Sequence, residues 1–600
     1  MKPRQIDRKW ILLGVGALLL CGLVIVPRLA GGSSALAKRA TDALATWTGG
    51  EVKLTGPLRM QYFPDIALRS GIELASVPNL PLVKSIVAKE ARISLDLPAI
   101  LLGHVRIDAV RLIEAEIALK EAPSLVMGPE QTLQARIANL LSGPPFRVLR
   151  MEGGVVKIPT ASGNETVEAL DARFDLSSGA LAGSGSFVLR KEPVSFTLDT
   201  GAPSETGDGL SVPASLSFDA PALDAALTGT ASFANGLQFD GDVEAATSDA
   251  RAFLRWTGIA LAEGKSLKAL SASGTAHWNG TTLTFDDGTF VLDGNEAVGA
   301  LAVTPGVRPR IDGTLAFDRL ALDPYAGGED AADAAAPARP DQSVLSHFDT
   351  DLRISAAEIT APGIQLGRGG FTVSADEGRI SSDVGELEFC GGTAAGRIDV
   401  DLSQATDSLK MAGKLSDVPI ETCLEPLGLH LPLKGTGILR VDFSATGQTY
   451  DALMRGLEGP FRFKARRGAV FIDLTRLLAG ADAQQGGGWS RDNVTAFDEL
   501  VADCRLGDGH IWCQKFNMKT EQGLISGSGD INLGQQTLDW RLFAADGAAP
   551  VNDAQLAAGT PPQVAISGAL MQPVISSAEQ APAHSGSLPT ASRSSEVSPR

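Results

Sequence analysis

Short runs of alternating apolar and polar residues recur along most of the chain. Ala91–Leu97, Val105–Asp108 and Thr284–Leu292 alternate clearly, the last around an Asp-Gly pair that we interpret as a turn. A period of two puts apolar side chains on one face of a strand and polar side chains on the other. Similar units, punctuated by glycine, continue to about residue 545 without a fixed repeat period. The pattern predicts many short antiparallel strands.

Helical patterns interrupt the strands in only a few places. The best candidates are an amphipathic segment at Ser34–Trp47 and shorter ones at Gln131–Leu141, Thr449–Leu457 and Asp473–Leu478. With 66 glycines and only 5% aromatic residues, the composition is typical of a chain with many strands and turns. We therefore expect a mainly β fold with a few short helices.

Changes in composition divide the chain into regions. Ala326–Gln342 is predicted to be a linker or loop, Gln484–Gly488 a flexible loop, and Ser576–Arg600, which is rich in Ser, Ala and Pro, a disordered tail. The predicted organisation is a cytoplasmic stub and anchor at 1–33, a β-rich region at 34–325, the linker at 326–342, a second β domain at 343–575 and the tail at 576–600.

One uncharged segment near the N-terminus, Trp10–Val26, is just long enough to cross a bilayer as a helix. It follows one acid, Asp7, and four basic residues, Lys2, Arg4, Arg8 and Lys9. Because basic flanks stay in the cytoplasm, we expect a single-pass inner-membrane protein with its N-terminus inside and its bulk in the periplasm. The residues assigned to the membrane anchor are Trp10, Ile11, Leu12, Leu13, Leu18, Leu19, Leu20, Leu23, Val24, Ile25 and Val26.

Two other interpretations of this segment are open. A cleaved signal peptide would use Ala35-Leu36-Ala37, but this site lies about eleven residues beyond the apolar run, farther than is usual. Lipid attachment at Cys21 would need a small residue before it, where the chain has Leu20. We therefore favour a retained anchor.

The four cysteines outside the anchor suit an oxidising compartment because their number is even. Asp508-Gly509 is typical of a type I′ hairpin turn, and a two-residue turn centred there puts Cys504 opposite Cys513 in a non-hydrogen-bonded pair. The Cα separation of such a pair, about 4.5 Å, accommodates a disulfide. Cys390 with Cys423 is then left by elimination. The four lack the CxxC spacing of zinc ligands.

Residue patterns that carry catalysis are missing from the sequence. The histidines, at positions 104, 277, 347, 430, 510 and 584, have no HExxH or paired-ligand spacing, and there is neither a GxSxG elbow nor a phosphate-binding GxxxxGK[ST] loop. The glycine pairs at 183–185 and 527–529 adjoin predicted strands rather than helices, and Asp286-Asp287 and Glu329-Asp330 fall in predicted loops. We expect no enzyme activity, no cofactor and no metal.

The net charge of −18 argues against a nucleic-acid partner, because phosphate binding requires clustered lysines and arginines. The alternation raises a different question. A sheet with one apolar face must cover that face with another sheet, close on itself, or take up other apolar material such as acyl chains. The pattern alone also fits an ordinary sandwich core.

Motifs at both ends of the chain resemble the AsmA family. At the N-terminal end they are Thr46–Leu58, Phe63–Leu68, Ile93–Gly103 and Val105–Asp108, following the anchor. At the C-terminal end they are Phe389–Gly396, Gly435–Gly437, Leu457–Pro460, Gly468–Leu474, Gly527–Leu533 and Val564–Gly568 to Pro573. The "G..NW" segment usual in the family is not evident near 121–131. The middle of the chain, about 200–340, resembles the family only in the general character of its sequence.

This resemblance implies an elongated, curved β-sheet that forms a groove, tethered to the inner membrane, with a role in outer-membrane assembly or lipid homeostasis. The expected partners are inner-membrane lipids and phospholipid acyl chains held in the groove. The alternative is a structural or assembly factor that affects the targeting of outer-membrane proteins by binding envelope proteins through sheet edges or loops. Which lipid is carried, and in which direction, does not follow from the sequence.

Overall fold

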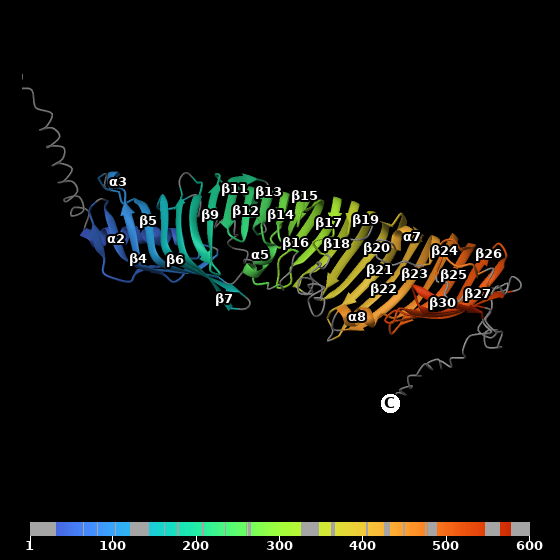
Figure 1. Ribbon diagram of the computed structural model, residues 1–600. Helices are drawn as coiled ribbons and strands as arrows, with labels where there is room; N and C mark the ends of the chain where they lie inside the picture. The colour runs from blue at the N-terminus through green and yellow to red at the C-terminus, as the bar shows by residue number, and fades with distance from the viewer. Residues whose placement is uncertain are drawn as a thin grey trace, which may run out of the picture. The chain divides into compact units, whose positions relative to one another are not determined.

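The computed structural model describes residues 32–577 except 64, 81, 102–103, 121–142, 161–162, 177–178, 207–208, 234–235, 260, 262–265, 326–346, 362–365, 404–405, 425–431, 448–449, 475–476, 478–488 and 546–563. The chain forms two compact units, and each is described by itself. Unit 1 holds residues 1–316 and 347–352, and unit 2 holds 317–346 and 353–600. Both are built mainly of β-strands, as the alternation predicts (Figure 1).

Unit 1 is a sheet whose strands pair in sequence order, almost always antiparallel (Figure 1). The exceptions are β5 and β6, which are parallel, and the short strands β1, β2 and β10, which pair at the ends of longer ones. Its strands are β1 (Val52–Leu54), β2 (Arg59–Gln61), β3 (Ala67–Leu74), β4 (Val83–Leu95), β5 (Ile107–Leu119), β6 (Val148–Thr160), β7 (Gly163–Asp175), β8 (Ala182–Leu189), β9 (Glu192–Thr200), β10 (Ser204–Thr206), β11 (Gly209–Ala220), β12 (Leu223–Ser232), β13 (Gln238–Thr247), β14 (Leu270–Trp278), β15 (Leu283–Leu292) and β16 (Asn295–Thr304). Its helices are α2 (Gly32–Thr48), α3 (Leu97–Leu101) and α5 (Ala250–Thr257).

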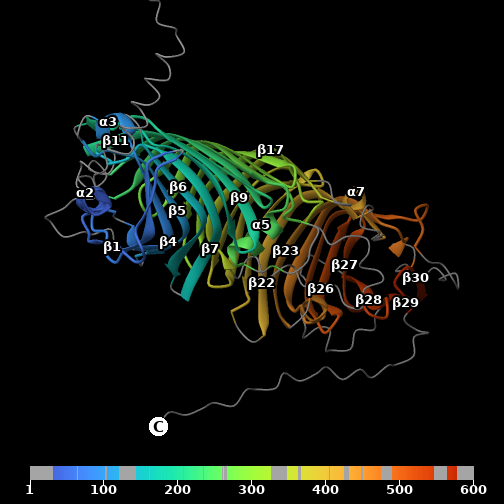
Figure 2. The same cartoon turned by 90° about the vertical axis from the view of Figure 1, so that its left-hand side faces the viewer.

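Helix α2 covers the apolar face of the first strands of unit 1 (Figure 2). Its buried residues Ala37, Ala40 and Leu44 join one core with residues such as Ile93 of β4 and Leu112 of β5. Because α2 is amphipathic, this packing removes its apolar stripe from water together with the apolar face of the strands. This is the largest core of unit 1, and it confirms the helix predicted at Ser34–Trp47.

From β9 onward, the apolar face of unit 1 carries two rows of apolar side chains. One row of cross-strand neighbours runs Leu198, Leu216, Leu227 and Val243, and the row beside it runs Phe196, Phe218, Ala225, Ala245, Ala272 and Phe290. On the opposite face, Ser215, Thr228, Asp242 and Thr275 form an equally continuous polar row. Leu198, Leu216 and Leu227 are half-buried rather than buried. The apolar face is therefore only partly shielded from solvent at β9, β11 and β12, whereas Val243 and Phe290 are buried in a small core of β13–β15.

The strands of unit 2 also pair antiparallel in sequence order, from β19 to β30 (Figure 1). The unit boundary falls within β17 (Arg310–Ala321) and β18 (Asp349–Thr360). The other strands are β19 (Leu366–Asp376), β20 (Arg379–Phe389), β21 (Gly392–Asp401), β22 (Asp407–Pro419), β23 (Leu433–Gly447), β24 (Gly459–Val470), β25 (Thr495–Gly507), β26 (His510–Thr520), β27 (Gly523–Asn532), β28 (Thr537–Ala545), β29 (Val564–Ala569) and β30 (Gln572–Ser577). Its helices are α7 (Ile420–Leu424) and α8 (Tyr450–Arg455).

Some local predictions need correction. Asp287-Gly288 is not a turn: it lies inside β15, where the pairing with β14 and β16 shifts register at a bulge. An Asp-Gly pair supports a bulge as well as a turn, and here both neighbouring strands continue past it. The glycines of 183–185 and 527–529 lie within β8 and β27, not beside them. Helix α8 confirms the helix predicted at Thr449–Leu457.

Several predicted segments lie outside the described residues. They are the membrane segment Trp10–Val26, the helix Gln131–Leu141, the linker Ala326–Gln342, the loop Gln484–Gly488 and part of the helix Asp473–Leu478. Ser576 and Ser577, the first residues of the predicted tail, end β30. Within the ranges that are described, no helix has the length and apolar character needed to span a bilayer.

The packing of α2 can be tested with Leu44→Ala. Removing this buried side chain from the core shared with β3–β5 should destabilise the N-terminal part of unit 1 by about 2–5 kcal/mol. Hydrogen–deuterium exchange of the full chain should then be faster in α2 and β3–β5 and unchanged in unit 2. Asp42→Ala, on the exposed side of the same helix, is the control. Equal exchange in both variants would contradict this account of the core.

Candidate functional site

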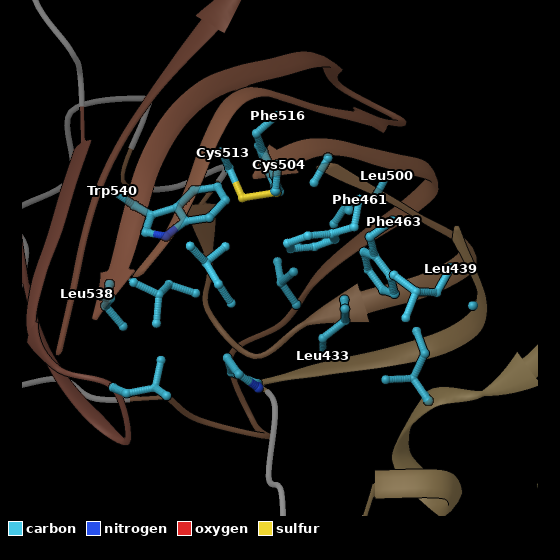
Figure 3. A pocket seen from close by; sticks show the side chains of 18 of the residues that line it. Leu433, Leu439, Phe461, Phe463, Leu500, Cys504, Cys513, Phe516, Leu538 and Trp540 are labelled. Carbon is cyan, nitrogen blue, oxygen red and sulfur yellow. A yellow bond between two sulfur atoms is a disulfide. The ribbon is translucent and has the colours of Figure 1, made fainter. Parts of the chain in front are cut away.

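An apolar pocket of about 540 Å³ lies inside unit 2, where the strands curve around it (Figure 3). Side chains from β22 to β29 line it, together with residues of α7 and of the β24–β25 connection. Figure 3 shows Leu439, Phe461, Phe463, Leu538 and Trp540 directed toward the same space. No described residue that lines the pocket is ionisable, apart from the cysteines of disulfides.

The register of the strands explains why apolar side chains gather here. One row of cross-strand neighbours is Leu415, Leu439, Phe463, Ala502, Phe516, Gly527, Leu542 and Val564. The row beside it is Val441, Phe461, Cys504, Cys513, Gly529, Trp540, Ile566 and Ile575. Most strands contribute every second residue, so the lining follows largely from the alternation in the sequence. In β26 a register shift between Cys513 and Phe516 puts two residues three positions apart on the same face.

Glycine makes room for large rings on this face. A Cβ atom on Gly529 would come within 2.5 Å of the ring of Trp540, its neighbour on β28. The indole can therefore lie across the β27 backbone, where it makes an edge contact with Phe516 at 5.2 Å between ring centroids. The glycine pair at 527–529, predicted to be a turn or bulge, is thus a place of close side-chain approach.

The opposite face of the same strands is charged. Lys414, Arg440, Arg462, Asp503 and Lys515 form a row of cross-strand neighbours, one residue out of step with the pocket row. Arg462 and Asp503 form an ion pair. Nearby, hydrogen bonds from Arg397 and Ser381 lower the pKa of Asp399. A one-residue shift of register would exchange these charges for the pocket lining, so the pairing is strongly specified.

The Cys504–Cys513 disulfide is part of the pocket wall (Figure 3). The two residues are cross-strand neighbours in the hairpin of β25 and β26, with Cα atoms 4.0 Å apart. Asp508 and Gly509 have φ of 47° and 70°, as a type I′ turn requires. The structure thus has the predicted hairpin, turn and cysteine pairing.

The second disulfide holds helix α7 beside the pocket. It joins Cys390, in the turn between β20 and β21, to Cys423 of α7, with Cα atoms 5.2 Å apart. This is the pairing predicted by elimination. Ile420, at the start of α7, is buried against Gly437 of β23, where a Cβ atom would come within 3.0 Å of it. α7 therefore forms one border of the pocket.

The connection between β24 and β25 closes another border, through residues Phe471–Leu474 and Trp489–Ser490, here called the closing segment. The hydroxyl of Thr495 donates to the carbonyl of Ile472 (2.7 Å) and accepts from the backbone N–H of Leu474 (2.8 Å). The indole of Trp489 donates to the carbonyl of Leu570, in the β29–β30 turn, at 2.8 Å. The closing segment thus ties the middle of the sheet to its last hairpin.

His277 and two carboxylates form a polar cluster in unit 1. His277 contacts Asp240 (2.5 Å) and Asp286 (3.3 Å) on the polar face, so it is not the isolated histidine that its spacing suggested. The hydrogen bond to Asp240 raises the pKa of His277. Among the described residues, no group of three His, Cys, Asp or Glu side chains could hold a metal ion.

Sequence reasoning identified the cysteines of the pocket wall but not the rest of its lining. Leu439, Val441 and Phe443 alternate with polar residues in β23, as Phe461, Phe463 and Ala465 do in β24. These runs carried the signal that would have found the pocket. Trp489 carried no such signal, because its hydrogen-bond partner is 81 residues away.

The role of Trp489 is testable with Trp489→Phe, which keeps an aromatic ring but removes the N–H donor. Loss of the bond to Leu570 should cost about 0.5–1.5 kcal/mol. Hydrogen–deuterium exchange should become faster in β29 and β30. Trp512→Phe, on the polar face of β26, is the control and should leave those strands unchanged. Unaltered exchange in Trp489→Phe would show that the closing segment does not hold the last hairpin.

Comparison with known proteins gives one match. No curated protein and no solved structure matches the chain. Residues 324–528 match the AsmA family. They comprise about a third of the chain and include β19 to β26, with most of the strands that line the pocket. The match includes four of the motifs found at the C-terminal end, from Phe389–Gly396 to Gly468–Leu474, and it supports the resemblance to the AsmA family over residues 324–528.

Proposed function

We propose that the protein is anchored in the inner membrane, lies mostly in the periplasm, and takes up phospholipid acyl chains on the apolar face of its sheet. Lipid homeostasis or outer-membrane assembly is the process it serves. It works as a passive carrier, without catalysis and without a cofactor.

The observation that carries this proposal is the chemistry of the pocket. Its volume of about 540 Å³ lies within the range of about 300–1,000 Å³ that ligand sites usually have. Such sites normally contain a few polar groups that orient the ligand. This lining is aliphatic and aromatic apart from three disulfide-bonded cysteines, and the indole N–H of Trp489 donates to the carbonyl of Leu570. A hydrocarbon chain fits this lining, because it needs no polar partner.

The apolar rows of unit 1 support the same function. The rows run through seven strands, β9 and β11–β16, which at about 4.8 Å per strand correspond to roughly 30 Å. They are half-buried at β9, β11 and β12, and Val243, Phe290 and Ala297 farther along are buried. This length is comparable to the hydrocarbon thickness of a bilayer, also about 30 Å, and so to two acyl chains end to end. An apolar face of this extent would be stabilised by covering it with acyl chains.

The proposed location rests on two features of different kinds. The sequence predicts the anchor at Trp10–Val26, with basic residues before it. Both cysteine pairs are disulfide-bonded, and disulfides persist in the periplasm but are rare in the cytosol. Together they favour a chain whose β units lie outside the cytoplasm.

Photo-crosslinking can test whether lipid occupies the apolar face. In the full chain, p-benzoylphenylalanine replaces Leu439, which lines the pocket, or Arg440, the next residue and on the charged face. A second pair is Leu227 and Thr228 in unit 1. Mass spectrometry should find phospholipid adducts at Leu439 and Leu227 and none at Arg440 and Thr228, because adjacent strand residues face opposite sides.

Two results would reject the carrier function. Protein adducts at Leu439 and Leu227, in place of lipid, would favour the alternative of an assembly factor that binds envelope proteins. Equal lipid labelling at adjacent positions would indicate contact with bulk membrane or detergent rather than uptake on one face.

Substitution offers an independent test. Leu439→Glu places a carboxylate in the apolar lining, where an unpaired charge is strongly disfavoured beside hydrocarbon. We expect several-fold less phospholipid to co-purify with the full chain, measured per protein by mass spectrometry. Arg440→Glu makes a larger change in charge one residue away and should retain the wild-type amount. Equal lipid content in the two variants would contradict the proposed site.

A further inference from the structure

The connection between β2 and β3 presents exposed aromatic side chains at one edge of unit 1. Phe63 is 85% exposed and Tyr62 is 45% exposed. An exposed phenyl ring next to an exposed phenol leaves apolar surface in water, which contact with a partner would remove. Such side chains are suited to the interface between water and lipid. The ring of Phe63 is apolar, and Tyr62 combines an apolar ring with a polar hydroxyl group.

The ends of the Tyr62–Phe63 connection are fixed to the sheet. The side chain of Gln61 donates to the carbonyl of Phe63 at 2.8 Å. Asp65 is held by an ion pair with Arg92 and accepts from the hydroxyl of Ser94 at 2.7 Å. Burial acts to raise the pKa of Asp65, but the bonds from Ser94 and Arg92 outweigh it and lower the pKa. The aromatic side chains are thus presented at a defined place by charge-assisted hydrogen bonds.

Exposed basic residues lie on the neighbouring elements. Lys38 and Arg39 are in the first turns of α2, and Arg59 begins β2. Within the described part of the chain, none of these three cations is joined to a carboxylate by an ion pair. In a protein with a net charge of −18, cations without an ion pair on the elements next to the exposed aromatics favour an anionic lipid surface as the partner.

The short connection to the predicted anchor places this edge near the bilayer. Five residues, 27–31, separate Val26 from Gly32 at the start of α2, and an extended chain of this length reaches about 20 Å. Ala37 of α2 lines a small cavity with Leu58 and Leu68, on either side of the Tyr62–Phe63 connection. Leu68 pairs with Met60, two residues before Tyr62.

From these observations we infer that Tyr62 and Phe63 insert into the interface of the bilayer that the anchor crosses, with Lys38, Arg39 and Arg59 against anionic head groups. The inference rests on the proposed membrane anchor. It adds a second point of contact, which fixes the orientation of the first strands of unit 1 relative to the membrane. A single helix followed by a short connection would leave that orientation free.

The experiment uses the full chain in vesicles of phosphatidylethanolamine and phosphatidylglycerol, with p-benzoylphenylalanine in place of Phe63. Leu82 is the matched control, because it is 56% exposed and lies just before β4. Leu95, at the other end of β4, donates to the carbonyl of Ile66 at 2.8 Å, so the length of β4 separates the control from Phe63 by about 40 Å. We expect phospholipid adducts at Phe63 to exceed those at Leu82 by roughly tenfold. In detergent, adducts at Phe63 should be lost while those at Leu439 persist.

Each outcome has a distinct meaning. Equal adducts at Phe63 and Leu82, or protein adducts at Phe63, would overturn the membrane-contact inference. No lipid at Phe63, from a chain that co-floats with the vesicles and is labelled at Leu439, would also overturn it and would leave the carrier function standing. Lipid at Phe63 but none at Leu439 would support the membrane contact and reject the carrier function. A chain that does not co-float would reject the anchor and, with it, the inference.

Discussion

Both units depend on one constraint: a strand whose side chains alternate must find an environment for its apolar face. The backbone N–H and C=O groups form hydrogen bonds within the sheet. Strand pairing by itself does not remove the apolar side chains from water. In unit 2 the two faces differ sharply, with Leu439 and Phe463 on one side and Arg440 and Arg462 on the other. Keeping these sets apart fixes the register of every strand between β22 and β28.

The chain meets this constraint in different ways along its length. Helix α2 covers β3–β5 and gives an ordinary buried core. Between β22 and β29 the sheet curves around its own apolar face, and α7 and the closing segment border the space that remains. At β9, β11 and β12 the leucines of one apolar row are left half-buried. Coverage by the protein's own side chains is therefore complete at β3–β5 and incomplete at β9–β12 and around the pocket.

Much of the β architecture followed from local sequence, because alternation and turn chemistry act over a few residues. The hairpin at Asp508-Gly509 was predictable in register, and with it the Cys504–Cys513 pair. The same reasoning failed at Asp287-Gly288, since an Asp-Gly pair fits a bulge as well as a turn and only the neighbouring strands decide between them. The pocket was out of reach for a related reason. Alternation identifies an apolar face but not whether a helix, a second sheet or a ligand covers it, and the bond from Trp489 to Leu570 joins residues far apart in sequence.

For the passive carrier that we propose, an apolar lining would serve better than one with a few fixed polar groups. A buried carboxylate or amide would bind one lipid atom tightly and would have to be desolvated again whenever the lipid moved. A uniformly apolar wall offers each methylene group nearly the same environment, so a chain can slide without losing a specific contact. Rigidity must then come from elsewhere. In unit 2 it comes from the two disulfides beside the pocket and from the bonds of Thr495 and Trp489, which hold the wall in shape without presenting a charge to the space inside.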